Sequence, residues 1–309
     1  MIERIIAYGN VGVDIFLFLS GIGLYYSFQK DEQIIPFLRR RLTRVLPPVF
    51  IIFGAYCILD FLVMKYNPTV FLQSMTLMRF WLQGSGSIWF VSFILVFYLF
   101  YPTIYHYLFD RGNPTIRVLV ALVAVFIVNF VLQYAFPKFW SQTEIALTRI
   151  PITILGCYFG QLVYQKKQLP AVSSLIILAA AVLVFLLKNY LKLPVGFQNI
   201  WSRSLLGLGG GLLAYSFAII FELLGPGRIA KAILKFFGFF GWMSLEVYVA
   251  HLSMRRIYSE YFAVGRGRIS QYLLFALVAI VISALIRFSL DKLSLHLKKS
   301  RSLSSHDSS

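Results

Sequence analysis

Residues 39–64 read RRRLTRVLPPVFIIFGAYCILDFLVM, in which four arginines precede a proline pair and a long apolar run. Such a run predicts a membrane-spanning helix, because about 20 apolar residues cross the hydrocarbon core of a bilayer. Arg41 and Arg44 are three residues apart and Arg40 and Arg44 are four apart, so a helix places them on one face. The cluster has two interpretations: an anchor that contacts lipid head groups, or a receiver of phosphate, which guanidinium groups match well.

The composition of the whole chain indicates an all-α protein with several membrane spans. Of its 309 residues 59% are hydrophobic and 13% are charged, and the mean hydropathy is +0.77. A soluble chain of this length needs more polar surface to cover its core. The net charge of +17 comes from basic residues in loops between apolar segments. We therefore expect membrane lipids, and no nucleic acid, as its partners.

Apolar runs of about 20 residues predict about nine spans, arranged as a polytopic helical bundle in the cell membrane. Residues 1–290 are expected to form one membrane-embedded domain, and 291–309, which are basic and Ser-rich, a disordered cytoplasmic tail. The distribution of Lys and Arg between alternate loops favours an outside N-terminus and a cytoplasmic arginine cluster. The predicted spans are 11–28, 46–64, 87–107, 116–135, 145–164, 171–190, 203–223, 239–258 and 270–290.

Ionisable residues inside apolar spans are costly and are therefore functional candidates. Asp14 lies near the end of the first span, where it is either an interfacial carboxylate or part of a site. Glu246 and His251 lie deeper in a later span, five residues apart, so they do not share one helix face. His251 is either a general base or a packed, hydrogen-bonding residue. Trp89 lies at a span end, where the aromatic belt explains it and stacking on a sugar is the alternative.

The sequence contains no spacing that is typical of a metal or cofactor site. Cys57 and Cys157 lie singly in apolar stretches, away from any second cysteine. Zinc-type Cys/His spacing, a phosphate-binding glycine loop and a dinucleotide fingerprint are all missing. We expect no metal and no resident cofactor.

Four local patterns together resemble the acyltransferase-3 family of integral-membrane acyltransferases. Residues 9–21 (GNVGVDIFLFLSG) resemble its "GVDxFFxxSG" helix, and residues 40–47 (RRLTRVLP) resemble its "RxxR(I/V)xP" element. Trp89-Phe90, followed by Tyr98 and Pro102, resembles its "WFxxxxxxxYxxxP" helix, and residues 244–251 (SLEVYVAH) resemble its "SxxxYLxH" helix. The patterns occur in the order that the family has, and the hydropathy layout matches over the whole chain.

The resemblance implies a ten-helix protein that moves an acyl group, often acetyl, from a cytoplasmic donor such as acyl-CoA to a hydroxyl. The acceptor it implies is a cell-surface or exported carbohydrate or a lipid-linked sugar. Arg41 and Arg44, with Arg40 beside them, match the arginines that engage the donor in the family. Acyl-CoA is then a co-substrate rather than a bound cofactor. His251 and Glu246 are the candidates for catalysis, and Asp14 and Trp89 for the acceptor site or a structural role.

The N-terminal region departs from the family pattern. The family's first helix, ahead of the "GVD" helix, carries the His regarded as the catalytic base, and no residue of this sequence aligns with it. Three explanations follow: a misassigned start, a truncated and inactive protein, or substitution by His251. A transporter or flippase of a glycan or lipid-linked substrate is the alternative function, since Gly-rich helices and intramembrane charges also serve transport.

Overall fold

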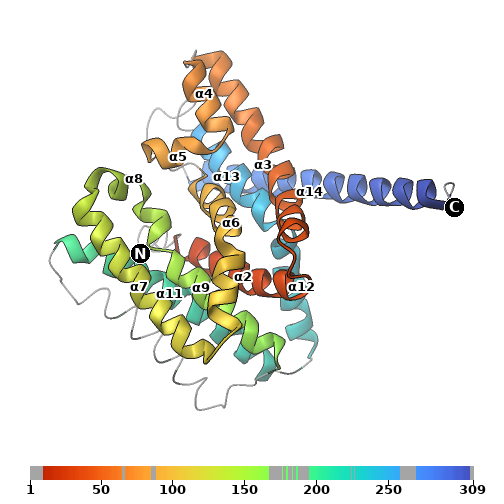
Figure 1. The fold of residues 1–309 in the computed structure, drawn as a ribbon. Coiled ribbons are helices and arrows are strands. Elements are labelled where there is room, and N and C mark those ends of the chain that lie inside the picture. Colours follow the sequence, from red (N-terminus) through yellow and green to blue (C-terminus); the bar gives the residue numbers. More distant parts are fainter. Residues whose placement is uncertain are drawn as a thin grey trace. The chain divides into compact units, whose positions relative to one another are not determined.

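Helices account for all regular structure in the described part of the chain (Figure 1). The structure, a computed structural model, describes residues 10–64, 67–84, 88–166, 195–223, 225, 227–257 and 269–306, with isolated positions 176, 179, 183 and 186. The predicted all-α class is confirmed. The helices are α2 (Asn10–Gln29), α3 (Ile34–Met64), α4 (Pro68–Met75), α5 (Met78–Gln83), α6 (Trp89–Phe109), α7 (Pro114–Ala135), α8 (Pro137–Leu147), α9 (Ile150–Tyr164), α11 (Val195–Leu223), α12 (Arg228–Trp242), α13 (Ser244–Ile257) and α14 (Ile269–His306).

The chain is an integral membrane protein, because several of these helices are long and apolar enough to cross a bilayer. Within the described residues six segments meet this requirement, or seven if the bent pair α12 and α13 counts as one span. The six are Ile34–Val63, Trp89–Phe109, Pro114–Ala135, Pro137–Tyr164, Arg203–Phe221 and Leu273–His296.

Within the described residues the count of six or seven spans is below the predicted nine, and three of the predicted spans account for the difference. The expected span 11–28 forms α2, which is not among the six segments and carries a fully buried Asp14. The expected span 239–258 is interrupted, because α12 and α13 meet at an angle of 60°. The expected span 171–190 lies outside the described residues, apart from four isolated positions.

The C-terminal segment also differs from the expectation. Helix α14 continues through His306, so residues 291–306 are helical where a disordered tail was predicted. The apolar run of 270–290 ends before these residues, and residues 291–309 are basic and Ser-rich. For this reason composition alone predicted disorder in the tail.

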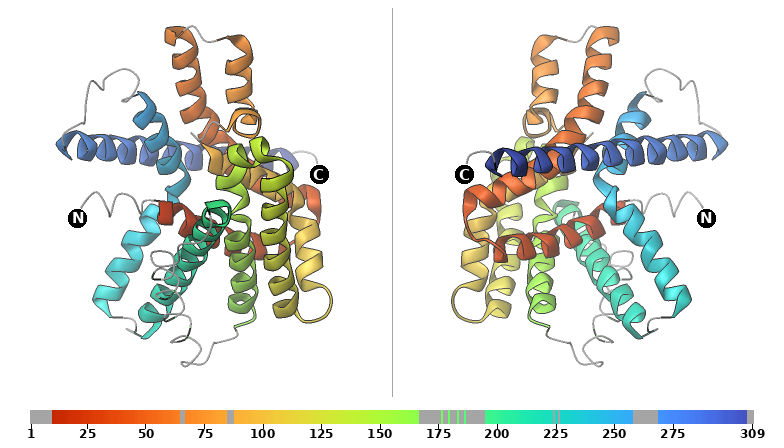
Figure 2. Two further views of the ribbon diagram at one scale, coloured as in Figure 1. Left: turned by 90° about the vertical axis from the view of Figure 1, so that its left-hand side faces the viewer. Right: turned by 90° about the vertical axis from the view of Figure 1, so that its right-hand side faces the viewer.

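The chain divides into two compact units, which are described separately. The first contains α2, α6, α7, α8, α9 and α11, and the second contains α4, α13, α14 and most of α3 and α12; α3 changes units between Arg39 and Arg40. In the second unit α13 packs on α14. The C-terminal half of α3 runs beside α4, with Phe61 and Phe71 in ring contact at 4.9 Å (Figure 2).

Close contact between α2 and α9 forms the centre of the first unit. Gly156 and Gly160 stand four residues apart on α9 and let the two backbones approach, as small residues do in membrane helices. A Cβ at Gly156 would lie 2.9 Å from the carbonyl carbon of Phe18, and one at Gly21 would lie 2.9 Å from the backbone nitrogen of Cys157. Helix α11 packs against the same pair.

Alanine at Gly21 or Gly156 should therefore destabilise the protein by about 1–3 kcal/mol, because the added methyl group meets backbone atoms that cannot move independently. Gly12→Ala on the same helix α2 is the matched control, since nothing lies within 4 Å of its Cβ position. Thermal unfolding in detergent measures the difference. Equal melting temperatures for Gly21→Ala and Gly12→Ala would contradict this packing.

Candidate functional site

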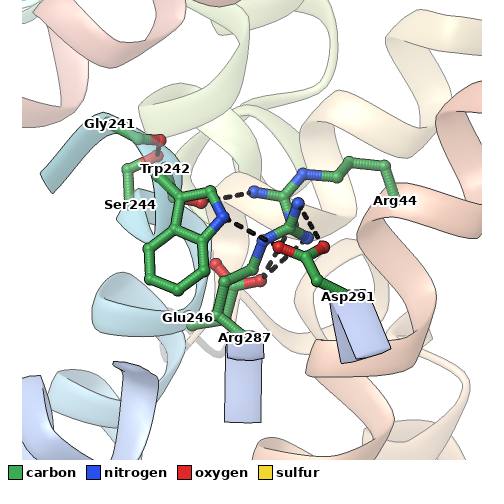
Figure 3. Close-up of polar contacts among 7 residues, drawn as sticks. All are labelled: Arg44, Gly241, Trp242, Ser244, Glu246, Arg287 and Asp291. Atoms are coloured by element: carbon green, nitrogen blue, oxygen red, sulfur yellow. Dashed lines mark hydrogen bonds and ion pairs between the residues drawn. The ribbon is translucent and has the colours of Figure 1, made fainter. Parts of the chain in front are cut away.

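Arg44 of α3 bridges the break between α12 and α13 in the second unit (Figure 3). Its Nη2 donates a hydrogen bond to the carbonyl oxygen of Trp242, the last residue of α12, at 2.9 Å. Its Nη1 donates to Oε1 of Glu246, in the first turn of α13, at 2.9 Å. The C-terminal carbonyls of a helix carry partial negative charge and lack helical partners. One guanidinium therefore satisfies the end of one helix and a carboxylate at the start of the next.

Glu246 is fully buried and binds two arginines. Besides Arg44, Nη1 of Arg287 on α14 lies 3.7 Å from the same Oε1 atom. A buried carboxylate needs such partners, because removal of a charge from water is costly. The N-terminal turn of α13 adds favourable partial positive charge. Because two guanidiniums contact its Oε1 atom, this carboxylate is suited to hold Arg44 in place.

Arg287 continues the network along α14. Its Nη2 lies 2.9 Å from Oδ1 of Asp291, and the indole Nε1 of Trp242 donates to Oδ2 of Asp291 at 2.8 Å. Figure 3 shows these contacts converging from α3, α12, α13 and α14. We call Arg44, Trp242, Glu246, Arg287 and Asp291 the Arg44 cluster. Sequence reasoning missed Arg287 and Asp291, although an i,i+4 pair of opposite charges at the end of an apolar run is a usable signal.

The Arg44 cluster leaves one guanidinium partly exposed, with two further arginines beside it on α3. Two arginines and two carboxylates balance within it, and Arg40 and Arg41, both half-buried, add positive charge one turn earlier on α3. The Arg44 side chain is 36% exposed. Its two hydrogen bonds use two of five N–H donors, so the group remains accessible to a further acceptor.

His251 lies on α13 but outside the Arg44 cluster. Its side chain is exposed, and in the described part of the chain it forms no hydrogen bond with Glu246. The five-residue separation corresponds to about 7.5 Å along a helix. The structure therefore brings Glu246, and not His251, to Arg44.

Asp14 and Trp89 meet a third residue, Arg149, in the first unit. Asp14 is fully buried, and its Oδ1 accepts a hydrogen bond from Nε of Arg149 at 2.7 Å. Arg149 is 2% exposed, and its guanidinium carbon lies 5.0 Å from the centroid of the Trp89 ring, in cation–π contact. Asp14 is thus a core ion-pair partner rather than an interfacial carboxylate. The sequence pattern did not predict the burial of Arg149.

The described residues contain no group of three His, Cys, Asp or Glu side chains close enough to hold a metal ion. In the Arg44 cluster the polar contacts are made by guanidinium groups, a kind of group that binds oxyanions.

Apolar spanning helices define a polytopic membrane protein, and one of them carries an accessible arginine that a buried carboxylate holds in place. The sequence profile of the acyltransferase-3 family, described as an acyltransferase domain, matches residues 3–288, and the chain belongs to this family. The resemblance inferred from the four motifs is confirmed. The protein is a membrane acyltransferase, with an acyl donor and an acceptor. Comparisons with curated proteins and with solved structures gave no match.

Removal of the Asp14 carboxylate should destabilise the protein by about 3–5 kcal/mol, because Asp14→Ala leaves the Arg149 charge buried without its ion pair. Replacement of both residues by apolar ones, Asp14→Leu with Arg149→Met, should recover most of that loss. Thermal unfolding in detergent is the measurement.

The matched control is Glu144→Ala, which breaks the ion pair with Arg203 at 2.7 Å. This pair belongs to the same unit but its side chains are 17% and 33% exposed, so the expected loss is below about 1 kcal/mol. A folded Asp14→Ala protein of unchanged stability that lacks transferase activity would contradict the structural role and favour a role at the acceptor site.

Proposed function

We propose that this protein moves an acyl group, acetyl in the first instance, from cytoplasmic acyl-CoA to a hydroxyl of a cell-surface or exported carbohydrate. The observation that carries the proposal is the accessible Arg44 guanidinium, fixed by Glu246 and by the carbonyl of Trp242. Coenzyme A bears a diphosphate and a 3′-phosphate, which guanidinium forks bind through charge-assisted hydrogen bonds.

Arg40, Arg41 and Arg44 form the donor site in this proposal. Arg41 and Arg44 lie three residues apart on α3 and share a face, so both reach one diphosphate. Glu246 is a positioning residue that acts through Arg44, because its carboxylate is buried and engaged by two arginines. A carboxylate beside an arginine that is proposed to bind an anion is explained by this role: Glu246 holds the Arg44 side chain in place.

His251 is the residue that we propose as the base. In the reaction, the imidazole takes the proton of the acceptor hydroxyl, and the oxygen attacks the thioester carbonyl carbon. The carbon–sulfur bond then breaks, and coenzyme A leaves as a thiolate that takes up the proton. The support for this role is that His251 is exposed on the same helix as Glu246, about one and a half turns along it from that residue.

Coenzyme A binding and acyl transfer test the proposal on protein reconstituted in lipid. Arg41→Ala and Arg44→Ala should each weaken coenzyme A binding by about 10- to 100-fold, the loss expected for a charge-assisted hydrogen bond. With labelled acetyl-CoA, cleavage of the thioester should fall in parallel. Arg39→Ala is the matched control, since Arg39 is exposed on the same helix outside the proposed site.

The same assay separates the proposed roles and the alternative function. His251→Gln should keep coenzyme A binding and lose transfer. Equal losses in Arg39→Ala and Arg44→Ala would reduce the cluster to general surface charge. Movement of a glycan across the bilayer without thioester cleavage would contradict the transferase assignment and favour a transporter.

A further inference from the structure

Helix α12 is strongly amphipathic and almost entirely exposed. Among the described helices of eight residues or more it has the clearest separation of polar and apolar sides. Of its fifteen residues only Ala230 is buried, and α12 is not among the helices that pack closely on another described helix. An exposed apolar surface on a membrane protein marks a contact with a partner or with lipid.

One side of α12 carries a strip of basic residues, which are Arg228, Lys231 and Lys235. They are three and four residues apart, so they line up along the first two turns. All three are exposed, and the helix contains no acidic residue that would offset their charge. We call these three residues the basic strip. Three like charges in a row complement an anionic surface.

The opposite side of α12 is apolar. Ile229, Ile233, Phe236 and Phe240 follow one another at spacings of four, three and four residues, which places them on one side of a helix. Ile229 is 78% exposed and Phe236 is 59% exposed. The rings of Phe236 and Phe240 contact each other at 4.9 Å, so this side is continuous into the last turns. Basic residues opposite phenylalanines are typical of helices that lie in a membrane interface.

The C-terminal end of α12 lies where α3 enters its apolar run. The carbonyl oxygen of Trp242 accepts a hydrogen bond from Arg44, and the indole Nε1 donates one to Asp291 (Figure 3). Arg44 is the last charged residue before the uncharged residues 45–59 of α3. Phe239 and Trp242 form a ring contact at 6.1 Å, and tryptophan is enriched at the membrane surface. This end of α12 therefore lies near the membrane interface.

The direction of α12 from this end follows from its charges and its bend. The axis of α12 turns by 60° from that of α13, so the two helices do not follow one line across the bilayer. If α12 ran from Trp242 into the hydrocarbon, Lys235 would lie about 10 Å deep and Arg228 about 21 Å deep, at a high cost for each charge. If α12 ran into water, its phenylalanines would lose their apolar surroundings. A path along the interface avoids both costs.

We propose that α12 lies in the membrane interface, with the basic strip on the head groups of anionic phospholipids and the apolar side among the acyl chains. The basic strip does not belong to the Arg44 cluster, and this surface goes beyond the proposed acyl transfer. Its tests use no coenzyme A, so their outcome is independent of the donor site.

Spin labels on single introduced cysteines test the orientation of α12 in liposomes of phosphatidylcholine and phosphatidylglycerol. The labels replace Ile229, Phe236 and Phe240 on the apolar side and Gly238 on the opposite side, where nothing lies within 4 Å of the Cβ position. Accessibility to oxygen and to a water-soluble nickel chelate reports depth. The three apolar positions should share one depth below the head groups, and Gly238 should face water. Both native cysteines are buried, and the chain without an introduced cysteine gives the background.

A half-span would give a different depth pattern. The depth would change steadily between Ile229 and Phe240, by about 16 Å, and Gly238 would be as inaccessible to the chelate as its neighbours. That result would overturn the interfacial orientation. Free access of the chelate to all four labels would also overturn it, because the helix would then not touch the membrane.

A fluorophore at Gly238 tests the basic strip. Its quenching by phosphatidylglycerol that carries a nitroxide near the head group is compared with quenching by equally labelled phosphatidylcholine at the same mole fraction. Phosphatidylglycerol should be the stronger quencher by about twofold or more, because the strip attracts anionic lipid. Lys231→Gln with Lys235→Gln should bring the ratio close to one, whereas arginine at both positions should preserve it, since the charge is kept.

Lys30→Gln with Lys166→Gln is the matched control, because both lysines are exposed, lie outside α12 and carry the same total charge. This variant should leave the quenching ratio unchanged. Equal quenching by the two lipids in the wild-type protein, or equal falls in the two double variants, would overturn the binding of anionic lipid by the basic strip. Lys231 and Lys235 are exposed, so their substitution leaves folding intact.

Discussion

The bond between Arg44 and Glu246 is the constraint on which the second unit depends. Glu246 is fully buried in a helix pair that crosses or enters the membrane, and a carboxylate in that setting must be paired. Arg44 supplies the partner and also caps α12 through the carbonyl of Trp242. The break between α12 and α13 is thus stabilised from α3, and the same guanidinium remains accessible for chemistry. Arg44 thus has both a structural role and the proposed binding role.

The first unit also contains a buried carboxylate, and this carboxylate pairs with an arginine that is itself buried. Its buried carboxylate, Asp14, pairs with Arg149, which is almost without exposure, beneath the Trp89 ring. Helix α2, which carries Asp14, and helix α9, which begins after Arg149, approach each other closely at Gly21, Gly156 and Gly160. An arginine buried this deeply is unsuited to bind a large ligand. The two ion pairs therefore serve different purposes: one is closed and structural, and the other keeps an exposed edge.

Local sequence signals predicted the features that depend on local physics. Apolar run length located the spanning helices, and the spacing of the arginines on residues 39–44 located the candidate donor site. The partners of the buried charges could not be predicted in this way. Arg149 is 135 residues from Asp14, and Glu246 is 202 residues from Arg44, so both pairings are products of helix packing. The break after Trp242 was also missed, since an apolar run does not reveal where a helix bends.

A double-mutant cycle on coenzyme A affinity tests whether Glu246 acts through Arg44. The cycle compares wild type, Arg44→Ala, Glu246→Ala and the double variant, each in lipid. We expect Glu246→Ala to weaken binding when Arg44 is present and to change it little when residue 44 is alanine, which corresponds to a coupling of about 1–3 kcal/mol. Additive effects, within about 0.5 kcal/mol, would contradict it.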